Sequence, residues 1–143
     1  MIDFLIAGHG SFASGILSSV EMIFGSQDQI ETVEFFDDET KSELDNKIDL
    51  ALSRHANAKG ILLFCDVLQG SPFQSAAMKA LVDPRIRVVY GTNVAMVLEC
   101  VSQSRIGDPS VEKLAALAVE TGVAHVGIFL PESGTKEQAW QEQ

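Results

Sequence analysis

Apolar residues occur in short blocks along this chain, and the blocks alternate with longer amphipathic stretches. The short blocks predict strands over residues 2–7, 30–36, 61–65 and 86–90. In the longer stretches apolar residues recur every three or four positions, which predicts helices that begin near Phe12, Thr40, Ser71, Asn93 and Asp108. Strands that alternate with helices indicate right-handed βαβ units. We therefore predict an α/β fold with a mainly parallel sheet and helices on both faces.

Polar residues mark the starts of two of these helices. Thr40 and Glu43 form a capping-box pattern, in which a side chain at each position bonds to the backbone N–H of the other. Ser71 and Gln74 repeat this pattern, and Pro72 stands at the favoured first helical position. The Ser71 hydroxyl therefore has a structural explanation as the cap of its own helix.

The end of the chain departs from the alternation of strands and helices. The last two predicted helices follow each other directly, and residues 124–129 then form a short apolar run. We expect this run to be a fifth strand, antiparallel at an edge of the sheet. Because an unpaired edge invites pairing with another chain, we also expect a homodimer formed through it. Residues 131–143 are polar and aperiodic, which predicts a tail after one domain of residues 1–130.

The length and composition fit a globular cytoplasmic protein. A chain of 143 residues is long enough for one domain that buries roughly 70% of its unfolded surface. No apolar run approaches the ~20 residues that cross a bilayer, and the N-terminus lacks the pattern of an export signal. Cys65 and Cys100 are isolated in apolar stretches, which is typical of reduced core residues in a cytosolic protein.

The charge of the chain restricts its partners. The formal net charge is −10, whereas nucleic-acid binding draws most of its affinity from a basic surface. Docking onto an anionic membrane surface is disfavoured for the same reason. An acidic surface suits a basic protein partner, which it would attract over long range, but it also serves solubility alone. Charge by itself leaves both explanations open.

Two predicted strands end in a polar residue that is followed by a loop of small residues and a helix. His9 lies between two glycines after the first strand, and Asp66 follows the third. In the flavodoxin-like strand order 2-1-3-4 these two strand ends are neighbours, at the point where ligands collect in such sheets. A carboxylate that accepts the Nδ1–H of a histidine fixes its tautomer and leaves Nε2 free to act as a nucleophile. The pair predicts a phosphoryl acceptor.

The loop after His9 provides candidates for binding a phosphoryl group. Gly10, Ser11 and Phe12 begin a helix, and their N–H groups would point toward an anion on the histidine. The helix dipole would add roughly 0.3–1 kcal/mol, and up to ~2 kcal/mol in a partly buried site. Ser71 is a further candidate with two open roles: its hydroxyl donates to a phosphate oxygen, or it serves only as a cap.

Other polar residues are weaker candidates. Thr92 and Asn93 follow the fourth strand at the same edge of the sheet, so we expect them to line the pocket. His55 and His125 look peripheral. The histidines and cysteines lack metal-ligand spacing, and there is no phosphate-binding lysine loop. We therefore expect no metal and no cofactor.

The same histidine loop also fits a dinucleotide-binding fingerprint. Residues 8–13 match G-x-G-x-x-A between a strand and a helix, and Asp37 or Asp38 follows the second strand, where a ribose partner is expected. Against this interpretation, the chain has material for little more than one mononucleotide-binding half and has no substrate domain.

Four ordered segments resemble the enzyme IIA domain of the mannose family of the sugar phosphotransferase system. They extend over residues 2 to about 129 and read G-H-G-S-F-A-S-G, F-C-D-V-L-Q-G-S-P-F, Y-G-T-N-V-A-M-V-L-E and L-A-A-L-A-V-E-T-G. The resemblance implies a phosphotransferase whose His9 is phosphorylated by the carrier protein HPr and passes the phosphoryl group to a IIB subunit. That subunit in turn feeds a IIC/IID membrane permease. Asp66 would be the orienting carboxylate, and the fifth strand would be exchanged across a homodimer.

One departure from the family pattern lies beside the predicted site. The family loop usually has two glycines before Ser-Pro-Phe, whereas here Gln69 precedes Gly70. This difference affects the expected path of the backbone in the loop and any expected contact of Ser71 with a phosphoryl group. Two alternatives stay open. One is a phosphotransfer component that feeds dihydroxyacetone kinase, in which the histidine is usually followed by serine rather than Gly10. The other is a non-catalytic binding module, in which an accessible His-Asp pair would have no role.

Overall fold

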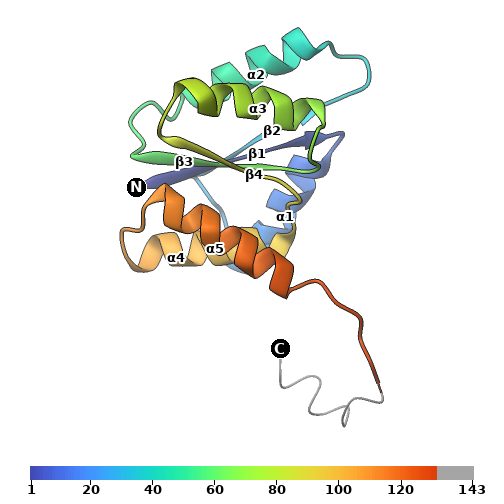
Figure 1. Ribbon diagram of the computed structural model, residues 1–143, viewed down its shortest axis with the longest axis vertical. Helices are drawn as coiled ribbons and strands as arrows, with labels where there is room; N and C mark the ends of the chain where they lie inside the picture. The colour runs from blue at the N-terminus through green and yellow to red at the C-terminus, as the bar shows by residue number, and fades with distance from the viewer. Residues whose placement is uncertain (132–143) are drawn as a thin grey trace.

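Strands and helices alternate in the computed structural model, which describes residues 1–131 (Figure 1). The strands are β1 Ile2–His9, β2 Ile30–Phe35, β3 Gly60–Cys65 and β4 Ile86–Val89. The helices are α1 Phe12–Phe24, α2 Lys41–Ser53, α3 Ser71–Val82, α4 Val94–Ile106 and α5 Val111–Ala124. The predicted α/β class is thus confirmed, and the predicted boundaries of these four strands agree with the observed ones to within two residues.

The four strands form one parallel sheet in the order β2-β1-β3-β4, as predicted. β1 is central. Its residue Ala7 lies opposite Cys65 of β3, and its last residue, His9, lies opposite Phe35 of β2. This register brings the carboxyl ends of β1, β2 and β3 together at one edge of the sheet. The loops that follow these strands are therefore neighbours.

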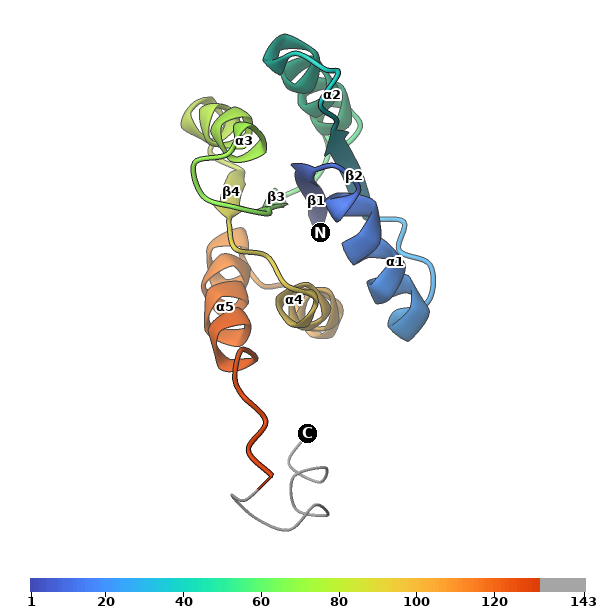
Figure 2. The same cartoon turned by 90° about the vertical axis from the view of Figure 1, so that its right-hand side faces the viewer.

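Helices cover both faces of the sheet (Figure 2). α2 and α3 lie on one face, and α1, α4 and α5 lie on the other. Successive residues of β1 point to opposite faces, so Phe4 and Ile6 join the core under α1, α4 and α5, while Leu5 and Ala7 join the core under α2 and α3. Burial on both faces explains why the central strands are almost continuously apolar.

The helix starts confirm one of the two predicted capping boxes. The Thr40 hydroxyl accepts the Glu43 N–H at 3.1 Å, and the Glu43 carboxylate accepts the Thr40 N–H at 3.1 Å. The second prediction was wrong: α3 is capped by Gly70 without a side-chain hydrogen bond, and Ser71 is already its first residue. The Gln74 side chain turns instead to the carbonyl oxygen of Gln69.

The chain leaves the body of the molecule after α5. The predicted strand over residues 124–129 is absent from the described part of this single chain, because α5 continues through Ala124 and residues 126–129 join no sheet. Figure 1 shows this red segment running away from the helices. The predicted polar tail of residues 131–143 lies outside the described residues except for Pro131. None of the helices described here has the length and apolar character that crossing a bilayer requires.

Candidate functional site

His9 stands at the end of the buried central strand. The residues before it in β1 are largely buried, whereas its own side chain is 48% exposed. The strand continues two residues further than the sequence predicts, because His9 still pairs with Phe35 of β2. The imidazole is therefore carried on rigid sheet backbone and yet remains open to solvent.

Asp66 follows β3 and binds His9 in two ways. Its Oδ2 accepts the His9 ring Nδ1–H at 2.7 Å and the His9 backbone N–H at 2.8 Å. Its Oδ1 accepts the backbone N–H of Val67 at 2.8 Å. The parallel β1–β3 pairing puts these residues side by side, as the strand order predicts. Because Nδ1 is engaged, Nε2 is the ring nitrogen left without a protein partner among the described residues.

The Asp66 side chain is only 11% exposed. Burial alone would raise the pKa of this carboxyl group, but the N–H donors of His9 and Val67 and the ring of His9 outweigh burial. The pKa of Asp66 therefore lies below its ordinary value. The carboxylate stays ionised at neutral pH and can stabilise positive charge that develops on the imidazole.

The start of α3 lies against the Cε1–Nε2 edge of the His9 ring. A Cβ added to Gly70 would lie 2.7 Å from His9 Cε1 and 3.5 Å from His9 Nε2. Within residues 1–131 the backbone N–H groups of Gly70 and Ser71 have no hydrogen-bond acceptor, nor does the Ser71 hydroxyl make a hydrogen bond. An anion on Nε2 would therefore meet the N-terminus of α3. The sequence had pointed to Ser71 at this place, but not to Gly70.

The start of α1 is less available than predicted. The Gly10 N–H donates to the Phe35 carbonyl oxygen at 2.7 Å, in an isolated bridge that extends the contact of β1 with β2. The prediction that this N–H is free was therefore wrong. Ser11 is exposed and caps α1 without a side-chain hydrogen bond. Phe12 packs its ring against Gly8.

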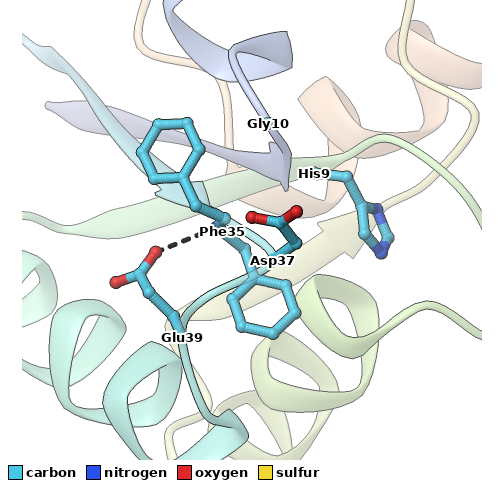
Figure 3. A pocket seen from close by; sticks show the side chains of 6 residues that line it. His9, Gly10, Phe35, Asp37 and Glu39 are labelled. Atoms are coloured by element: carbon cyan, nitrogen blue, oxygen red, sulfur yellow. Dashed lines mark hydrogen bonds between the residues drawn. The ribbon is translucent and has the colours of Figure 1, made fainter.

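A pocket of about 410 Å³ opens beside His9, on the β2 side of the ring. Figure 3 shows the side chains that gather where β1 and β2 end. Phe35, Phe36, Asp37 and Glu39 line it together with the histidine loop. Sequence reasoning had considered Asp37 only for a ribose and had missed the others. The available signal for these residues was a phenylalanine directly before a run of acidic residues at the end of a strand.

Glu39 organises the far wall of this pocket. Its Oε1 accepts the Phe36 N–H at 2.9 Å, and its Oε2 pairs with Lys47 at 2.5 Å. The hydrogen bond from Lys47 and the N–H of Phe36 hold the pKa of Glu39 below its ordinary value. Glu39 is therefore ionised at neutral pH, and Lys47 balances its charge.

Several other candidates lie away from His9. The Thr92 hydroxyl and N–H both bind the Cys65 carbonyl oxygen, at 2.6 and 3.2 Å, and Asn93 caps α4. Neither lines the His9 pocket, which corrects that prediction. His55 lies at the opposite end of the sheet, and His125 caps α5. Over residues 1–131 no cluster of His, Cys, Asp and Glu side chains is arranged to hold a metal ion.

A family model described as "PTS system fructose IIA component" matches residues 3–119. The mannose-specific EIIAB component of the phosphotransferase system (PTS) from Escherichia coli K12 is 34% identical over 121 residues, which are 85% of this chain. The chain spans 37% of the length of that relative. The PTS fructose-specific EIIA component of Bacillus subtilis is 32% identical over 71% of this chain and 70% of its own length.

Solved structures agree with these matches. The crystal structure of a phosphotransferase system EIIA component from Streptococcus agalactiae has a TM-score of 0.80 and 28% sequence identity. The match covers 90% of this chain and 98% of that one. A mannose/sorbose-specific IIA subunit from Enterococcus faecalis has a TM-score of 0.79, also at 28% identity.

Proposed function

The chain belongs to the mannose family of IIA components of the sugar phosphotransferase system, and on that premise we propose that it accepts a phosphoryl group on His9 Nε2 from phosphorylated HPr and passes it to a IIB subunit. The single observation that carries this proposal is the 2.7 Å hydrogen bond between His9 Nδ1 and Asp66. It holds the tautomer in which the exposed nitrogen has a lone pair.

The transfer needs no net gain or loss of protons at the acceptor. The lone pair of Nε2 forms a bond to phosphorus while the bond between phosphorus and the HPr histidine nitrogen breaks, and HPr leaves with that electron pair. The Nδ1 proton stays in its hydrogen bond to Asp66. Positive charge that develops on the His9 ring is balanced by the Asp66 carboxylate. The same sequence in reverse delivers the phosphoryl group to a histidine of the IIB subunit.

The phosphoryl oxygens would be bound by helix N-termini. Gly70 and Ser71 at the start of α3 are the better supported donors, because Gly70 lies against the reacting edge of the ring. Ser11 and Phe12 at the start of α1 remain candidates from the other side of His9. Backbone N–H groups at a helix start favour anions through both hydrogen bonds and the helix dipole.

The surroundings of His9 suit basic protein partners that approach from the cytoplasm. Asp37 and Glu39 line the pocket beside the ring, and the whole chain has a net charge of −10. Complementary charge mainly raises the rate of encounter, which fits a carrier that must meet two partners in turn. We propose that HPr and the IIB subunit dock at this edge, and that a IIC/IID permease receives the phosphoryl group through IIB.

The proposed assembly is a homodimer in which residues 126–129 pair with the partner. β4 is an edge strand of the sheet, and an apolar groove of about 350 Å³ lies between β4 and α5. Ile128 is 85% exposed in the single chain, and Val126 and Phe129 are exposed as well. An exchanged strand would cover these side chains and complete the open edge.

Phosphorylation with labelled phosphoenolpyruvate, enzyme I and HPr tests the proposal. Wild-type protein should acquire label that is lost in acid and kept in base, because a phosphohistidine is a phosphoramidate. His9→Ala should acquire none, while His55→Ala and His125→Ala should label normally. Label that persists in His9→Ala, or that survives acid, would place the nucleophile elsewhere.

A further inference from the structure

Gln69 is the one non-glycine residue in the described chain with a positive φ, at 73°. L-residues enter this left-handed region at a cost, because Cβ crowds the following carbonyl group. Gln69 lies in the turn between Asp66, which binds His9, and Gly70, which contacts the ring. A strained conformation is thus maintained immediately beside the proposed phosphoryl acceptor.

Gln74 holds this turn at two successive carbonyl groups. Its side-chain Nε2 donates to the Gln69 carbonyl oxygen at 3.1 Å, and its backbone N–H donates to the Gly70 carbonyl oxygen at 2.9 Å. Gly70 lies between these two anchors. The peptide that joins residues 69 and 70 is trans and planar, so fixing the Gln69 carbonyl also fixes the opposite direction of the Gly70 N–H.

We propose that Gln74 is a positioning residue whose side-chain amide keeps the Gln69–Gly70 peptide in place, so that the Gly70 N–H stays available to a phosphoryl group on His9 Nε2. This inference rests on the proposed role of His9. Gln74 is exposed on a helix and would influence the reaction through the backbone, without touching the phosphoryl group.

The strain at Gln69 and the hydrogen bond from Gln74 act on the turn in opposite directions. Without the amide of Gln74, residue 69 is free to relax to an ordinary negative φ. Such a change redirects the chain just before Gly70 and turns the Gly70 N–H to a new direction. Glycine at position 69 would remove the strain, because glycine adopts positive φ without a Cβ penalty. The need for Gln74 should then disappear.

The variants follow from this competition. Gln74→Met keeps the length and helix preference of the side chain and removes its donor. Gln69→Gly combined with Gln74→Met tests whether relief of the strain restores the turn. Gln103→Met is the matched control, because Gln103 also lies in a helix and its side-chain amide donates, among the described residues, only to Glu99 one turn earlier.

Each full-length protein is phosphorylated in two ways, by phosphorylated HPr and by potassium phosphoramidate, a small reagent that transfers its phosphoryl group to imidazole with release of ammonia. We expect the Gly70 N–H resonance of wild-type protein to move downfield on phosphorylation, and to move less in Gln74→Met. Transfer from HPr should be about three- to tenfold slower in Gln74→Met, as expected for the loss of one neutral hydrogen bond. The double variant and Gln103→Met should both behave as wild type.

Two results would overturn the inference. One is a Gln74→Met protein with the wild-type Gly70 shift and the wild-type transfer rate. The other is a slower rate that Gln69→Gly does not restore, since the loss would then not arise in the turn. Failure of the proposed function looks different: phosphoramidate would label wild-type His9 and shift the Gly70 resonance, while HPr would transfer nothing. The Gly70 shifts of the variants would still decide the role of Gln74.

Discussion

Asp66 determines the orientation of His9 because its two carboxylate oxygens accept three N–H groups. Oδ2 takes the ring and the backbone of His9, and Oδ1 takes the backbone of Val67. The carboxylate therefore connects the end of β1 to the turn that leads into α3. A change at this one side chain should affect both the tautomer of His9 and the position of the turn.

Asp66→Asn should slow phosphorylation of His9 by about two orders of magnitude or more. An amide offers one oxygen in place of two, so either the His9 donors or the Val67 N–H must face an NH2 group. The charge that balances the ring during transfer is lost as well. The initial rate of transfer from phosphorylated HPr measures the effect. A rate within a few-fold of wild type would contradict the assigned role of Asp66.

Gly70→Ala should impair phosphorylation while leaving the fold intact. Gly70 has φ −76° and ψ 165°, which alanine adopts freely, so the backbone itself is not strained. The added methyl group would lie 2.7 Å from His9 Cε1, and the ring cannot retreat without stretching its bond to Asp66. The rate of phosphoryl transfer and a thermal unfolding curve separate the two effects.

Gly107→Ala is the control for this substitution, since a Cβ at Gly107 meets no atom within 4 Å. Equal transfer rates for the Gly70 and Gly107 variants would mean that Gly70 does not limit access to the ring.

At the scale of secondary-structure elements, a second histidine joins three segments at the other end of the sheet. His55 follows α2 and binds Asp3 of β1 through Nδ1 at 2.7 Å and Glu31 of β2 through Nε2 at 2.7 Å. Arg54 also contacts Glu31. Because both ring nitrogens face carboxylates, the protonated imidazolium satisfies both partners, while the neutral ring satisfies only one.

This cluster predicts a pH-dependent part of the unfolding free energy. Burial alone would lower the pKa of His55, but the hydrogen bonds to Asp3 and Glu31 outweigh it and raise the pKa above its ordinary value. The stabilisation is therefore complete below the unfolded pKa of about 6.5 and is lost as pH rises through the folded pKa. Denaturant unfolding of wild type and His55→Gln at several pH values should show a difference that shrinks as pH rises above about 6.5.

His125→Gln is the matched control, because His125 is exposed and, within residues 1–131, its ring bonds to no group except the Thr121 carbonyl of its own helix. It should show no such trend. A wild-type advantage over His55→Gln that grows with rising pH would contradict the assignment of the imidazolium.

The sequence predicted the elements better than it predicted their ends. Alternation of apolar blocks was enough for the four strands and the α/β class, since a buried parallel sheet needs apolar residues on both faces of its strands. The strand order came from the flavodoxin-like pattern. The continuation of β1 to His9 depends on pairing with Phe35, which no local pattern reveals. The predicted cap at Ser71 was wrong for two reasons. Gly70 is the N-cap residue, and the Gln74 side chain donates to the Gln69 carbonyl oxygen instead.

The sequence predicted the two main residues of the candidate site but not the contacts of the loops around them. His9 and Asp66 could be paired because each follows a strand, and strand ends converge in a parallel sheet. The contact of Gly70 with the ring, and the bond between Gly10 and Phe35, depend on the exact path of loops. Such details arise from tertiary packing and leave no trace in the residue types alone.

At the scale of the whole molecule, the described chain leaves an apolar strand edge and an apolar C-terminal segment uncovered. Val126, Ile128 and Phe129 are exposed, and the groove beside β4 is lined by Val88, Val119 and Val123 among others. A single copy of the chain would expose this apolar surface to water, which an exchanged strand in a dimer would avoid.

Ile128→Asp should therefore weaken the dimer. An aspartate would have to be buried without a partner in the exchanged strand, which costs several kcal/mol. Light scattering coupled to size exclusion should give a dimer for wild type at micromolar concentration and a larger monomer fraction for the variant. Ala116→Asp is the control, because it also adds one negative charge but lies on the exposed side of α5. A wild-type monomer would contradict the proposed assembly.

We expect His9 to carry the phosphoryl group on Nε2 while Nδ1 keeps its proton for Asp66. Two-bond ¹H–¹⁵N NMR of the imidazole side chains, recorded before and after phosphorylation by HPr, tests it directly. Only the His9 ring should change, with phosphorus coupled to Nε2 and a protonated Nδ1. Phosphorus on Nδ1, on His55 or on His125 would contradict it.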